Sequence, residues 1–563
     1  MNAVSPTSAI DRGLTGYADE GFSRFLRRAF LSSAGLDAED LGRPIVGIAH
    51  TISDYVTCHR DMPQLVDAIE RGILEAGGMP FSFPVLGLGE PLLTPTAMVY
   101  RNLAAIAVEE LVRAQPMDSV VLVGGCDKTV PAQLMGAVSA GRPAIACVSG
   151  SMYAGRWQGE RIGACTDCRR TWARHRAGEI EGDELGAIQA ELCPTAGTCM
   201  VMGTASTMAC VTEALGLMLP GGATPQAPSA ARLGHGTATG RAAVALAGGA
   251  PAPGELLSAG SFRNAFIVLA AIGGSTNAVI HLTAVARRAG LPVDLDFVAA
   301  AFADVPLLVD LKPTGNHFME HFHADGGVPM LMKELAPLLD GSARTVEGGT
   351  VADRIAAVAR SPRPGGAIAT LAEPLGGPGS LTVLRGSLAP AGALIKSAAA
   401  SPELLRHAGR AVVFDSPEDA ARRLDDPGLE VEPGDVLVLR NAGPVRGMPE
   451  AGSMPIPRRL AEAGVKDMVR VSDARMSGTS YGTVVLHCSP EAAVGGPLAL
   501  VRDGDEIELD VAAGRIDLRV EDRELEARRA EWAPEPPAER GWRRLLGERV
   551  VGADLGADLD FLA

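Results

Sequence analysis

The sequence predicts an α/β protein in two parts: an N-terminal α/β domain with a largely parallel sheet, and a smaller C-terminal domain resembling a β-barrel. Strand-like apolar runs alternate with amphipathic helical stretches over the first two-thirds of the chain. The chain becomes rich in Gly and Pro around residues 345–380, and short β-rich runs follow. Because 563 residues exceed one ordinary hydrophobic core, we expect two or three domains, with the main boundary between residues 1–372 and 373–563.

The N-terminal elements follow the pattern of parallel βαβ units, in which apolar runs end in Gly-rich turns and lead into helices. Strands are predicted at PIVGIAH (44–50), FSFPVLGLG (81–89) and SVVLVGG (119–125), and helices at 61–78 and 96–114. Ligands collect at the carboxyl ends of the strands in such sheets. The segment GGCDK lies where the third of these strands ends, so we expect chemistry at Cys126.

The C-terminal elements are short strands separated by Gly, Pro and Asp turns, a texture typical of a small barrel or sandwich with a helix or two. The predicted strands are AVVFD (411–415), DVLVLRNAG (435–443), DMVRVSDA (467–474), TVVLHCS (483–489) and EIELDVAAGRIDLRV (506–520). The tail from about Glu521 is charged, interrupted by Pro and weakly helical.

Composition restricts the partners of the chain. There are 51 Lys and Arg against 67 Asp and Glu, for a net charge of −16 without a basic block, which argues against nucleic-acid binding. The N-terminus lacks the pattern of a signal peptide, and no stretch of 18 uninterrupted apolar residues predicts a membrane span. We therefore expect a cytoplasmic enzyme that acts on a small molecule.

The cysteines are candidate metal ligands rather than disulfide partners. There are nine, an odd number, in a long chain without a secretory signal, so we expect reduced thiols. Cys126, Asp127 and Lys128 are consecutive and combine a thiolate that suits iron or zinc, a carboxylate that suits magnesium and a basic side chain. The segment is either part of a site for two metals or a strand-end turn with a buried Cys.

Cys58 and Cys199 also lie in turn contexts at the mouths of predicted helices. Three thiolates from three loops could hold an iron–sulfur cluster in which one iron lacks a Cys ligand and acts as a Lewis acid. Cys165 and Cys168 form a lone CxxC motif that could serve metal or redox chemistry, although no second pair completes a zinc site. The others are expected to be small core residues: Cys147, Cys193, Cys210 and Cys488.

Two carboxylates and one turn complete the candidates. Glu90 ends the run VLGLGE, and Glu450 lies in the loop AGPVRGMPEAG. Each carboxylate could bind a hard cation or could be a solvated surface residue. Residues 472–482, SDARMSGTSYG, place several hydroxyls in a Gly-flanked turn. Such turns are usually only turns, but a hydroxyl held beside a metal ion can lose its proton and act as a base.

These segments resemble, in order and across nearly the whole chain, the family of dihydroxy-acid dehydratases, 6-phosphogluconate dehydratases and sugar-acid dehydratases. The resemblance is carried by PIVGIAH, PTAMVYRN, GGCDKTVPA, PTAGTCMVMGTAS, AIGGSTNAVIHL, DGGVPMLMKEL, GSLAPAGALIK, RNAGPVRGMPE, SDARMSGTSYG and GGPLALVRDGDEIELDV. It implies an α/β domain followed by a β-barrel-like domain, with the site between them, and assembly as a homodimer or homotetramer.

The resemblance also implies a particular site. Cys58, Cys126 and Cys199 would hold a [2Fe-2S] or [4Fe-4S] cluster. Glu90, Asp127, Glu450 and Lys128, the last carrying a carbamate, would hold Mg²⁺. Ser477 would be the general base, with Thr479 a neighbouring hydroxyl near the cluster.

Within the family, CDKTVPA and SDARMSGTSYG look more like the pentonate and hexonate dehydratases, such as those for arabinonate or xylonate, than the branched-chain enzymes. The resemblance therefore implies dehydration of a 2,3-dihydroxy sugar acid to a 2-keto-3-deoxy acid. The alternatives are a branched-chain dihydroxy-acid dehydratase or a 6-phosphogluconate dehydratase and, more remotely, a non-catalytic iron–sulfur sensor. The first Cys motif reads VTCHR where relatives often have Pro before the Cys, so the resemblance does not predict the loop around Thr57 and His59.

Overall fold

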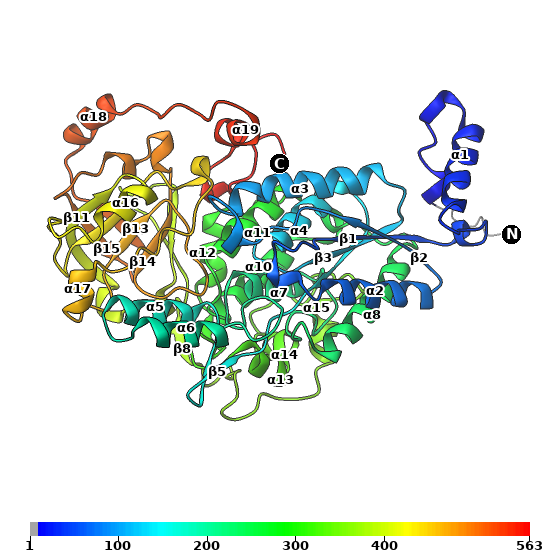
Figure 1. Cartoon of the computed structure of the whole chain (residues 1–563), viewed down its shortest axis with the longest axis horizontal. Helices are drawn as coiled ribbons and strands as arrows, with labels where there is room; N and C mark the ends of the chain where they lie inside the picture. The colour runs from blue at the N-terminus through cyan, green and yellow to red at the C-terminus, as the bar shows by residue number, and fades with distance from the viewer. Residues whose placement is uncertain (1–8, 563) are drawn as a thin grey trace.

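The computed structural model describes residues 9–562 and has two parts, as the sequence predicts (Figure 1). In the N-terminal part, helices surround a four-stranded sheet; in the C-terminal part, an eight-stranded sheet curves into a near-barrel. The prediction of an α/β fold with a parallel N-terminal sheet and a barrel-like C-terminal domain is confirmed.

The N-terminal sheet is entirely parallel, with strand order β2-β1-β3-β4. Its strands are β1 (Ile45–His50), β2 (Met79–Pro84), β3 (Ser119–Gly124) and β4 (Ala144–Val148). The central strand β3 is buried along its whole length because helices cover both faces of the sheet, which explains its unbroken apolar run. Helices α3 and α4 lie on one face and α2 and α8 on the other (Figure 1).

Further helices extend the N-terminal core. The helices of this part are α1 (Glu20–Ser32), α2 (Met62–Glu75), α3 (Met98–Ala114), α4 (Thr129–Ala140), α5 (Thr166–Arg176), α6 (Gly182–Glu191), α7 (Thr204–Ala214), α8 (Ala230–Leu246), α9 (Pro253–Leu256), α10 (Ala259–Ala271), α11 (Asn277–Arg288), α12 (Leu295–Phe302), α13 (Met319–Ala324), α14 (Gly327–Glu334) and α15 (Val351–Ala356). Two short ladders join loops, β5 (Gly155–Trp157) with β6 (Glu160–Ile162) and β7 (Pro306–Leu307) with β8 (Gly376–Pro378). Helices α10 and α11 are buried on nearly every side, so they lie within the core rather than on its surface.

The C-terminal sheet has the order β16-β15-β11-β12-β13-β14-β10-β9. Its strands are β9 (Thr382–Leu384), β10 (Gly392–Ile395), β11 (Arg406–Phe414), β12 (Val436–Leu439), β13 (Arg470–Ser472), β14 (Val484–Ser489), β15 (Glu506–Asp510) and β16 (Arg515–Leu518). Arg385, directly after β9, donates a backbone hydrogen bond of 2.8 Å to Gly514, just before β16, and accepts one of 2.9 Å from Ile516 within β16. These bonds link the first and last strands of the sheet and account for its barrel-like curvature.

Alternating residues of the C-terminal strands pack into two different cores. Val413 and Val438 belong to the core on one face of the sheet, whereas Phe414 and Leu439 belong to the core on the other face, which includes residues of α16 (Pro417–Arg423) and α17 (Arg458–Glu462). This period of two is expected of a sheet that is covered on both faces. The strands β11 to β14 are parallel to one another, so this domain also contains βαβ connections.

The C-terminal tail returns to the N-terminal part after α18 (Asp522–Glu531) and α19 (Gly541–Arg549). The indole of Trp542 donates a hydrogen bond of 2.7 Å to the carbonyl of Val99 in α3. Arg288 of α11 forms a fully buried ion pair of 2.6 Å with Asp558. Because these contacts connect residues far apart in the chain, the tail fastens the two parts to one another.

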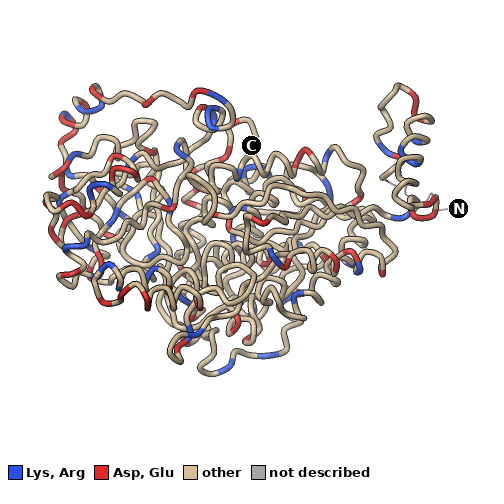
Figure 2. The backbone as a smooth tube through the Cα atoms, in the orientation of Figure 1, with Lys and Arg blue, Asp and Glu red and all other residues tan. Residues whose placement is uncertain are grey.

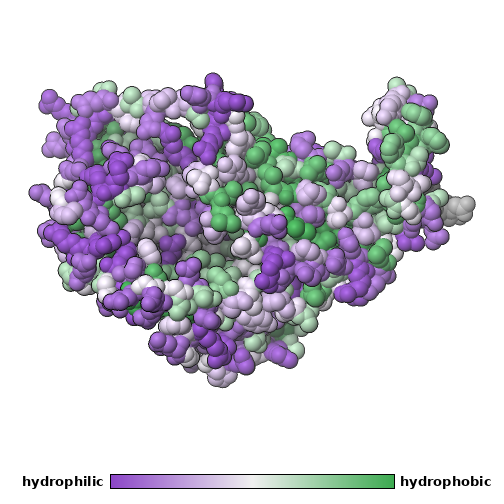
Figure 3. Space-filling view, in the orientation of Figure 1, coloured by the Kyte–Doolittle hydropathy of each residue, from purple (hydrophilic) through white to green (hydrophobic). Residues whose placement is uncertain are grey.

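Helix α1 projects away from the rest of the molecule next to the N-terminus (Figure 1). Arg12, which precedes it, pairs with Asp118 beside the sheet. Phe25 and Phe30 of α1 are 66% and 70% exposed, and apolar residues line this helix in Figure 3. The structure thus leaves an apolar helix face outside the core of its own chain.

Among residues 9–562, no helix is both long and apolar enough to cross a bilayer. Basic and acidic residues are interspersed along the backbone rather than gathered into regions of one sign (Figure 2).

Candidate active site

Three carboxylates that the sequence singles out come together between the two parts of the chain. Glu90 begins a short 3-10 helix after β2, Asp127 follows β3, and Glu450 lies in a loop of the C-terminal domain. One oxygen from each lies within 4.8 Å of the other two. Oxygen atoms at this spacing are a donor set that suits a hard cation such as Mg²⁺.

Arg475, in the turn after β13, lies among these carboxylates and is completely buried. Its guanidinium is 2.8 Å from Glu90, 2.5 Å from Glu450 and 3.9 Å from Asp127, and it also donates to the Thr96 hydroxyl at 2.6 Å. Burial opposes its charge, but the three carboxylates outweigh burial and raise the pKa of Arg475 above its ordinary value. Arg475 lies within the SDARMSGTSYG segment, where no role was predicted for it.

The protonation of the carboxylates reflects the same balance of burial and charge. Burial raises the pKa of Asp127, but the adjacent charges of Lys128 and Arg475 outweigh it and hold that pKa below its usual value. Burial dominates for Glu450 and raises its pKa, so this carboxyl is the one most easily protonated without a further cation. Lys128, the residue before α4, is fully buried and pairs with Asp127.

Four thiols lie beside the carboxylates. Cys126 directly precedes Asp127, and a hydrogen bond between its thiol and that of Cys58 lowers the pKa of Cys58. Cys199 lies in the loop before α7, with its sulfur 3.6 Å from that of Cys165 in the CxxC motif. The structure therefore brings together the three thiols that the resemblance implies and adds Cys165, which the sequence analysis had left with an open role.

His59 supports Cys126 and has no ring nitrogen left for proton transfer. Its Nδ1 donates to the Thr51 carbonyl at 2.8 Å, so Nε2 accepts the backbone N–H of Cys126 at 3.0 Å. Burial lowers the pKa of His59 to about 4, which keeps the ring neutral. The loop around Thr57 and His59, which the resemblance does not predict, is thus a short 3-10 helix, Thr57–His59. The His59 hydrogen bond holds this helix against the Cys126 turn.

The hydroxyl turn of the C-terminal domain contacts the Cys199 loop of the N-terminal domain. The hydroxyls of Ser477 and Thr479 are 2.8 Å apart. A Cβ added at Gly203 would lie 2.7 Å from a Thr479 methyl group and 4.0 Å from Cys199 Cβ, so the absence of a side chain at Gly203 permits this approach. Asn277 fixes the turn from the other side by donating to the Met476 carbonyl at 3.0 Å.

Lys396, directly after β10, is a second buried cation at this turn that the sequence analysis did not single out. Its ammonium donates to the Gly478 carbonyl at 3.3 Å, between Ser477 and Thr479. Burial lowers the pKa of Lys396 to about 7. The sequence does not distinguish a buried lysine after an apolar strand from an exposed one. The burial of Lys396 becomes evident only in the folded barrel.

The remaining cysteines follow the prediction with one exception. Cys147, Cys210 and Cys488 are buried, as expected of small core residues. Cys193 is exposed, and the prediction of a core position is wrong. The residue lies in the loop after α6, whose helical pattern ends just before it, so an apolar context in the sequence did not lead to burial.

Comparisons with known proteins agree with this arrangement. Residues 43–354 match the family described as "Dihydroxy-acid/6-phosphogluconate dehydratase N-terminal", and residues 366–557 match its C-terminal counterpart. The chain is 46% identical to L-arabinonate dehydratase of Rhizobium leguminosarum bv. trifolii, over 92% of this chain and 90% of that protein. It is 44% identical to 6-deoxy-6-sulfo-D-gluconate dehydratase of Pseudomonas putida (97% and 95%), and 38% identical to dihydroxy-acid dehydratase of Moorella thermoacetica (96% and 99%).

Proposed function

This chain belongs to the dihydroxy-acid/6-phosphogluconate dehydratase family and is a hydro-lyase, and on that premise we propose that it dehydrates a 2,3-dihydroxy sugar acid to a 2-keto-3-deoxy acid. The observation that carries the proposal is the meeting of Glu90 and Asp127 with Glu450 from the other domain, within 4.8 Å of one another. Those carboxylates lie next to a group of thiols and, with them, provide donors for one hard and one soft metal centre.

The residues fit both cofactors expected of the family. Cys58, Cys126 and Cys199 would hold an iron–sulfur cluster of the [2Fe-2S] or [4Fe-4S] type, and the carboxylates would hold Mg²⁺. When bound, Mg²⁺ would supply positive charge that stabilises the enolate-like transition state, and iron without a cysteine ligand would supply Lewis acidity toward the leaving hydroxyl.

Charge balance favours a carbamate on Lys128. Three carboxylates, Arg475 and an unmodified Lys128 together carry one net negative charge, and a divalent cation would turn this into a net positive charge in a buried site. A carbamate replaces the cation of Lys128 with an anion, which restores a net negative charge after the metal binds and adds an oxygen ligand.

Ser477 is proposed to take the proton from C2 of the substrate. A serine hydroxyl is a poor base unless nearby positive charge lowers its pKa. Lys396 donates to the carbonyl of Gly478, the next residue, and in its protonated form brings positive charge to this turn. Because its pKa is about 7, this form coexists with the neutral amine near neutral pH. The 2.8 Å contact with Thr479 orients the Ser477 hydroxyl, and the neutral, fully engaged ring of His59 makes it unsuitable as the base.

The substrate class is tested with anaerobically prepared, iron-loaded protein and Mg²⁺, by assaying keto-acid formation from L-arabinonate, D-xylonate, 6-deoxy-6-sulfo-D-gluconate and dihydroxyisovalerate. We expect turnover of at least one sugar acid. Dihydroxyisovalerate is the second candidate, because of the relative named dihydroxy-acid dehydratase, which is 38% identical. Absence of product from all three sugar acids would contradict the proposal, and product from dihydroxyisovalerate alone would favour the second candidate.

The chain is also proposed to assemble as a homo-oligomer through α1. The exposed Phe25 and Phe30 form part of an apolar helix face that projects from the molecule. Large exposed apolar patches are characteristic of surfaces that bind a partner. A second copy of the chain is the partner expected of a metabolic enzyme in this family.

A further inference from the structure

The CxxC motif lies at the iron–sulfur site rather than on a separate surface. Cys165 is the residue before α5, Cys168 lies within its first turn, and Cys165 reaches Cys199 with a sulfur–sulfur distance of 3.6 Å. The two sulfurs of a disulfide are about 2.05 Å apart, so the pair is not bonded. A tetrahedral metal with metal–sulfur bonds of about 2.3 Å holds two thiolates about 3.7 Å apart, which matches the observed spacing.

The four thiols thus form two contacting pairs. Cys58 shares a hydrogen bond with Cys126, and Cys165 contacts Cys199. Such a division into pairs is the arrangement expected when each of two irons takes two cysteine ligands. A three-ligand site accounts for Cys58, Cys126 and Cys199 but leaves the position of Cys165 without a purpose.

Local contacts hold Cys165 in this position. The hydroxyl of Thr166 donates to the Thr479 carbonyl at 3.1 Å, which ties the motif to the turn of the proposed base. Asp167 accepts from the Gly163 N–H at 2.7 Å and pairs with Lys312 at 2.8 Å. Because these bonds reach the Thr479 turn and Lys312 as well as the adjacent Gly163, the motif is part of the folded site rather than a loose loop.

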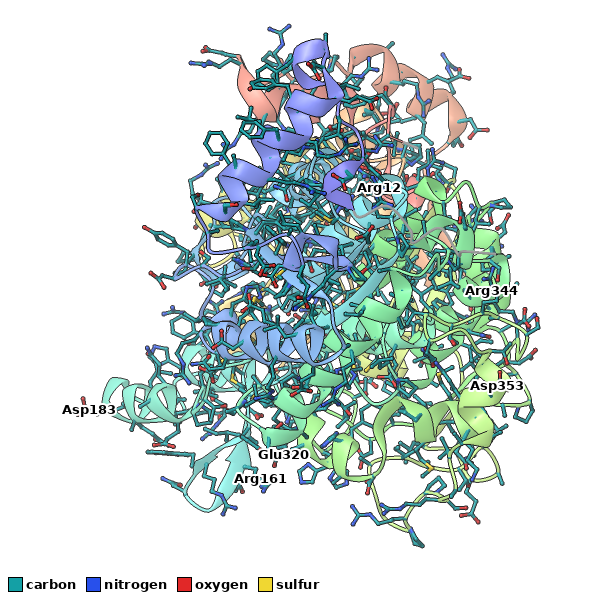
Figure 4. All side chains as sticks on the ribbon, turned by 90° about the vertical axis from the view of Figure 1, so that its right-hand side faces the viewer. Arg12, Arg161, Asp183, Glu320, Arg344 and Asp353 are labelled. Atoms are coloured by element: carbon teal, nitrogen blue, oxygen red, sulfur yellow. The ribbon has the colours of Figure 1, made fainter. Side chains whose placement is uncertain are left out.

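The segment before the motif is anchored as well. Arg161 of β6 pairs with Glu320 of α13, and Figure 4 shows the two labelled close together at the edge of the molecule. Met152, Ala164 and Phe318 pack around Cys165, Cys168 and Cys199 and provide apolar surroundings for the thiols.

We propose that Cys165 is a fourth thiolate ligand of the iron–sulfur cluster, bound in the absence of substrate to the iron that Cys199 holds and displaced when the substrate hydroxyl takes its place. The inference rests on the proposed function. The exchange would break one iron–sulfur bond and form one iron–oxygen bond to the substrate hydroxyl, so it needs no oxidant, reductant or added proton. The released thiolate accepts a hydrogen bond from the thiol of Cys168, which lies within reach.

The test compares wild type with Cys165→Ser, prepared anaerobically with the cluster in place, by iron content, visible absorption and the electron paramagnetic resonance spectrum of the reduced cluster. Without substrate, we expect the variant to retain iron but to give a different spectrum. With saturating L-arabinonate, or another acid from the panel that turns over, the two spectra should become alike, since Cys165 has left the iron in both. Cys193→Ser, an exposed thiol nearby, is the matched control and should match wild type throughout.

The outcomes separate the inference from the function on which it rests. Wild-type protein without iron would contradict the proposed function. An iron-loaded wild type whose substrate-free spectrum is reproduced by Cys165→Ser would overturn the inference alone. A thiol titration of denatured wild type that finds Cys165 and Cys168 joined in a disulfide would also overturn it.

Discussion

At the residue scale, Arg475 pairs with Glu90 and Glu450 and lies near the buried carboxylate of Asp127. Its contacts with Glu90 and Glu450, at 2.8 and 2.5 Å, give the guanidinium two carboxylate partners. Removing one partner of a buried ion pair typically costs about 3–5 kcal/mol, because it leaves the other charge unpaired. Arg475 thus holds the three carboxyl groups close to one another.

Glu450→Gln is predicted to weaken Mg²⁺ binding while leaving the thiol site intact. The change removes one negative ligand but keeps the size of the side chain, so turnover should fall steeply and recover in part as Mg²⁺ is raised. Steady-state rates over a Mg²⁺ titration measure the effect. Glu430→Gln, on the exposed surface of the same domain, is the matched control. A Glu450→Gln enzyme with the Mg²⁺ dependence of wild type would remove Glu450 from the site.

Cys58→Ser, Cys126→Ser and Cys199→Ser are each predicted to lower the iron content and visible absorption of the protein, because each removes one thiolate from the cluster. Iron per chain after anaerobic reconstitution is the measurement. Cys210→Ala, a buried position within α7, should bind iron as wild type does. Full iron content in any of the three serine variants would contradict the ligand assignment for that residue.

At the element scale, the short turns at strand ends decide the chemistry. The pattern of strands and Gly-rich turns allowed the Cys126 turn and the hydroxyl turn at Ser477 to be predicted from the sequence. Their meeting could not be predicted, because it depends on how the barrel packs against the N-terminal helices. Lys396 and the position of Cys165 opposite Cys199 became evident only with that packing.

Lys396→Met is predicted to raise the free energy of unfolding at neutral pH. The pKa of Lys396 is about 7 in the folded chain against an ordinary value of 10.5, so the unfolded chain binds the proton more tightly. Burial of Lys396 therefore destabilises the folded wild type by an amount on the order of a few kcal/mol. This destabilisation is complete below pH 7 and disappears as the pH rises toward 10.5. The stability advantage of the variant should therefore shrink over that interval.

Denaturant unfolding of wild type and Lys396→Met at a series of pH values between 7 and 10 measures this difference. Lys466→Met, at an exposed lysine of the same domain, is the control and should track wild type at every pH. A constant difference between Lys396→Met and wild type over the series would show that burial does not perturb this lysine.

At the scale of the whole molecule, the sequence pattern predicted two parts. Strand-like runs alternate with long helical stretches in the N-terminal part, whereas short strand-like runs between Gly, Pro and Asp turns follow in the C-terminal part. The sequence did not reveal that the tail crosses back to α3 and α11, since its charged, Pro-interrupted pattern resembles a surface segment. The buried pair of Arg288 with Asp558 depends on the folded arrangement alone.

Replacing Phe25 and Phe30 together by Asp is predicted to dissociate the oligomer, because two charges would have to be buried at the proposed α1 interface. The mass of the particle by light scattering, compared with wild type, is the measurement. Phe561→Asp changes an aromatic residue of similar exposure in the tail and should leave the mass unchanged. A monomeric wild type, or a double variant of unchanged mass, would contradict the proposed interface.

The central claim is that this chain dehydrates a sugar acid by proton abstraction at Ser477. It is tested most directly by comparing wild type and Ser477→Ala, both loaded with iron and Mg²⁺, on the active sugar acid in deuterated water. Wild type should form the 2-keto-3-deoxy acid with deuterium at C3. The variant should bind the acid and keep its cluster spectrum, but lose at least about a hundred- to ten-thousand-fold in rate and leave the C2 hydrogen unexchanged. Near-normal turnover by Ser477→Ala would contradict the account.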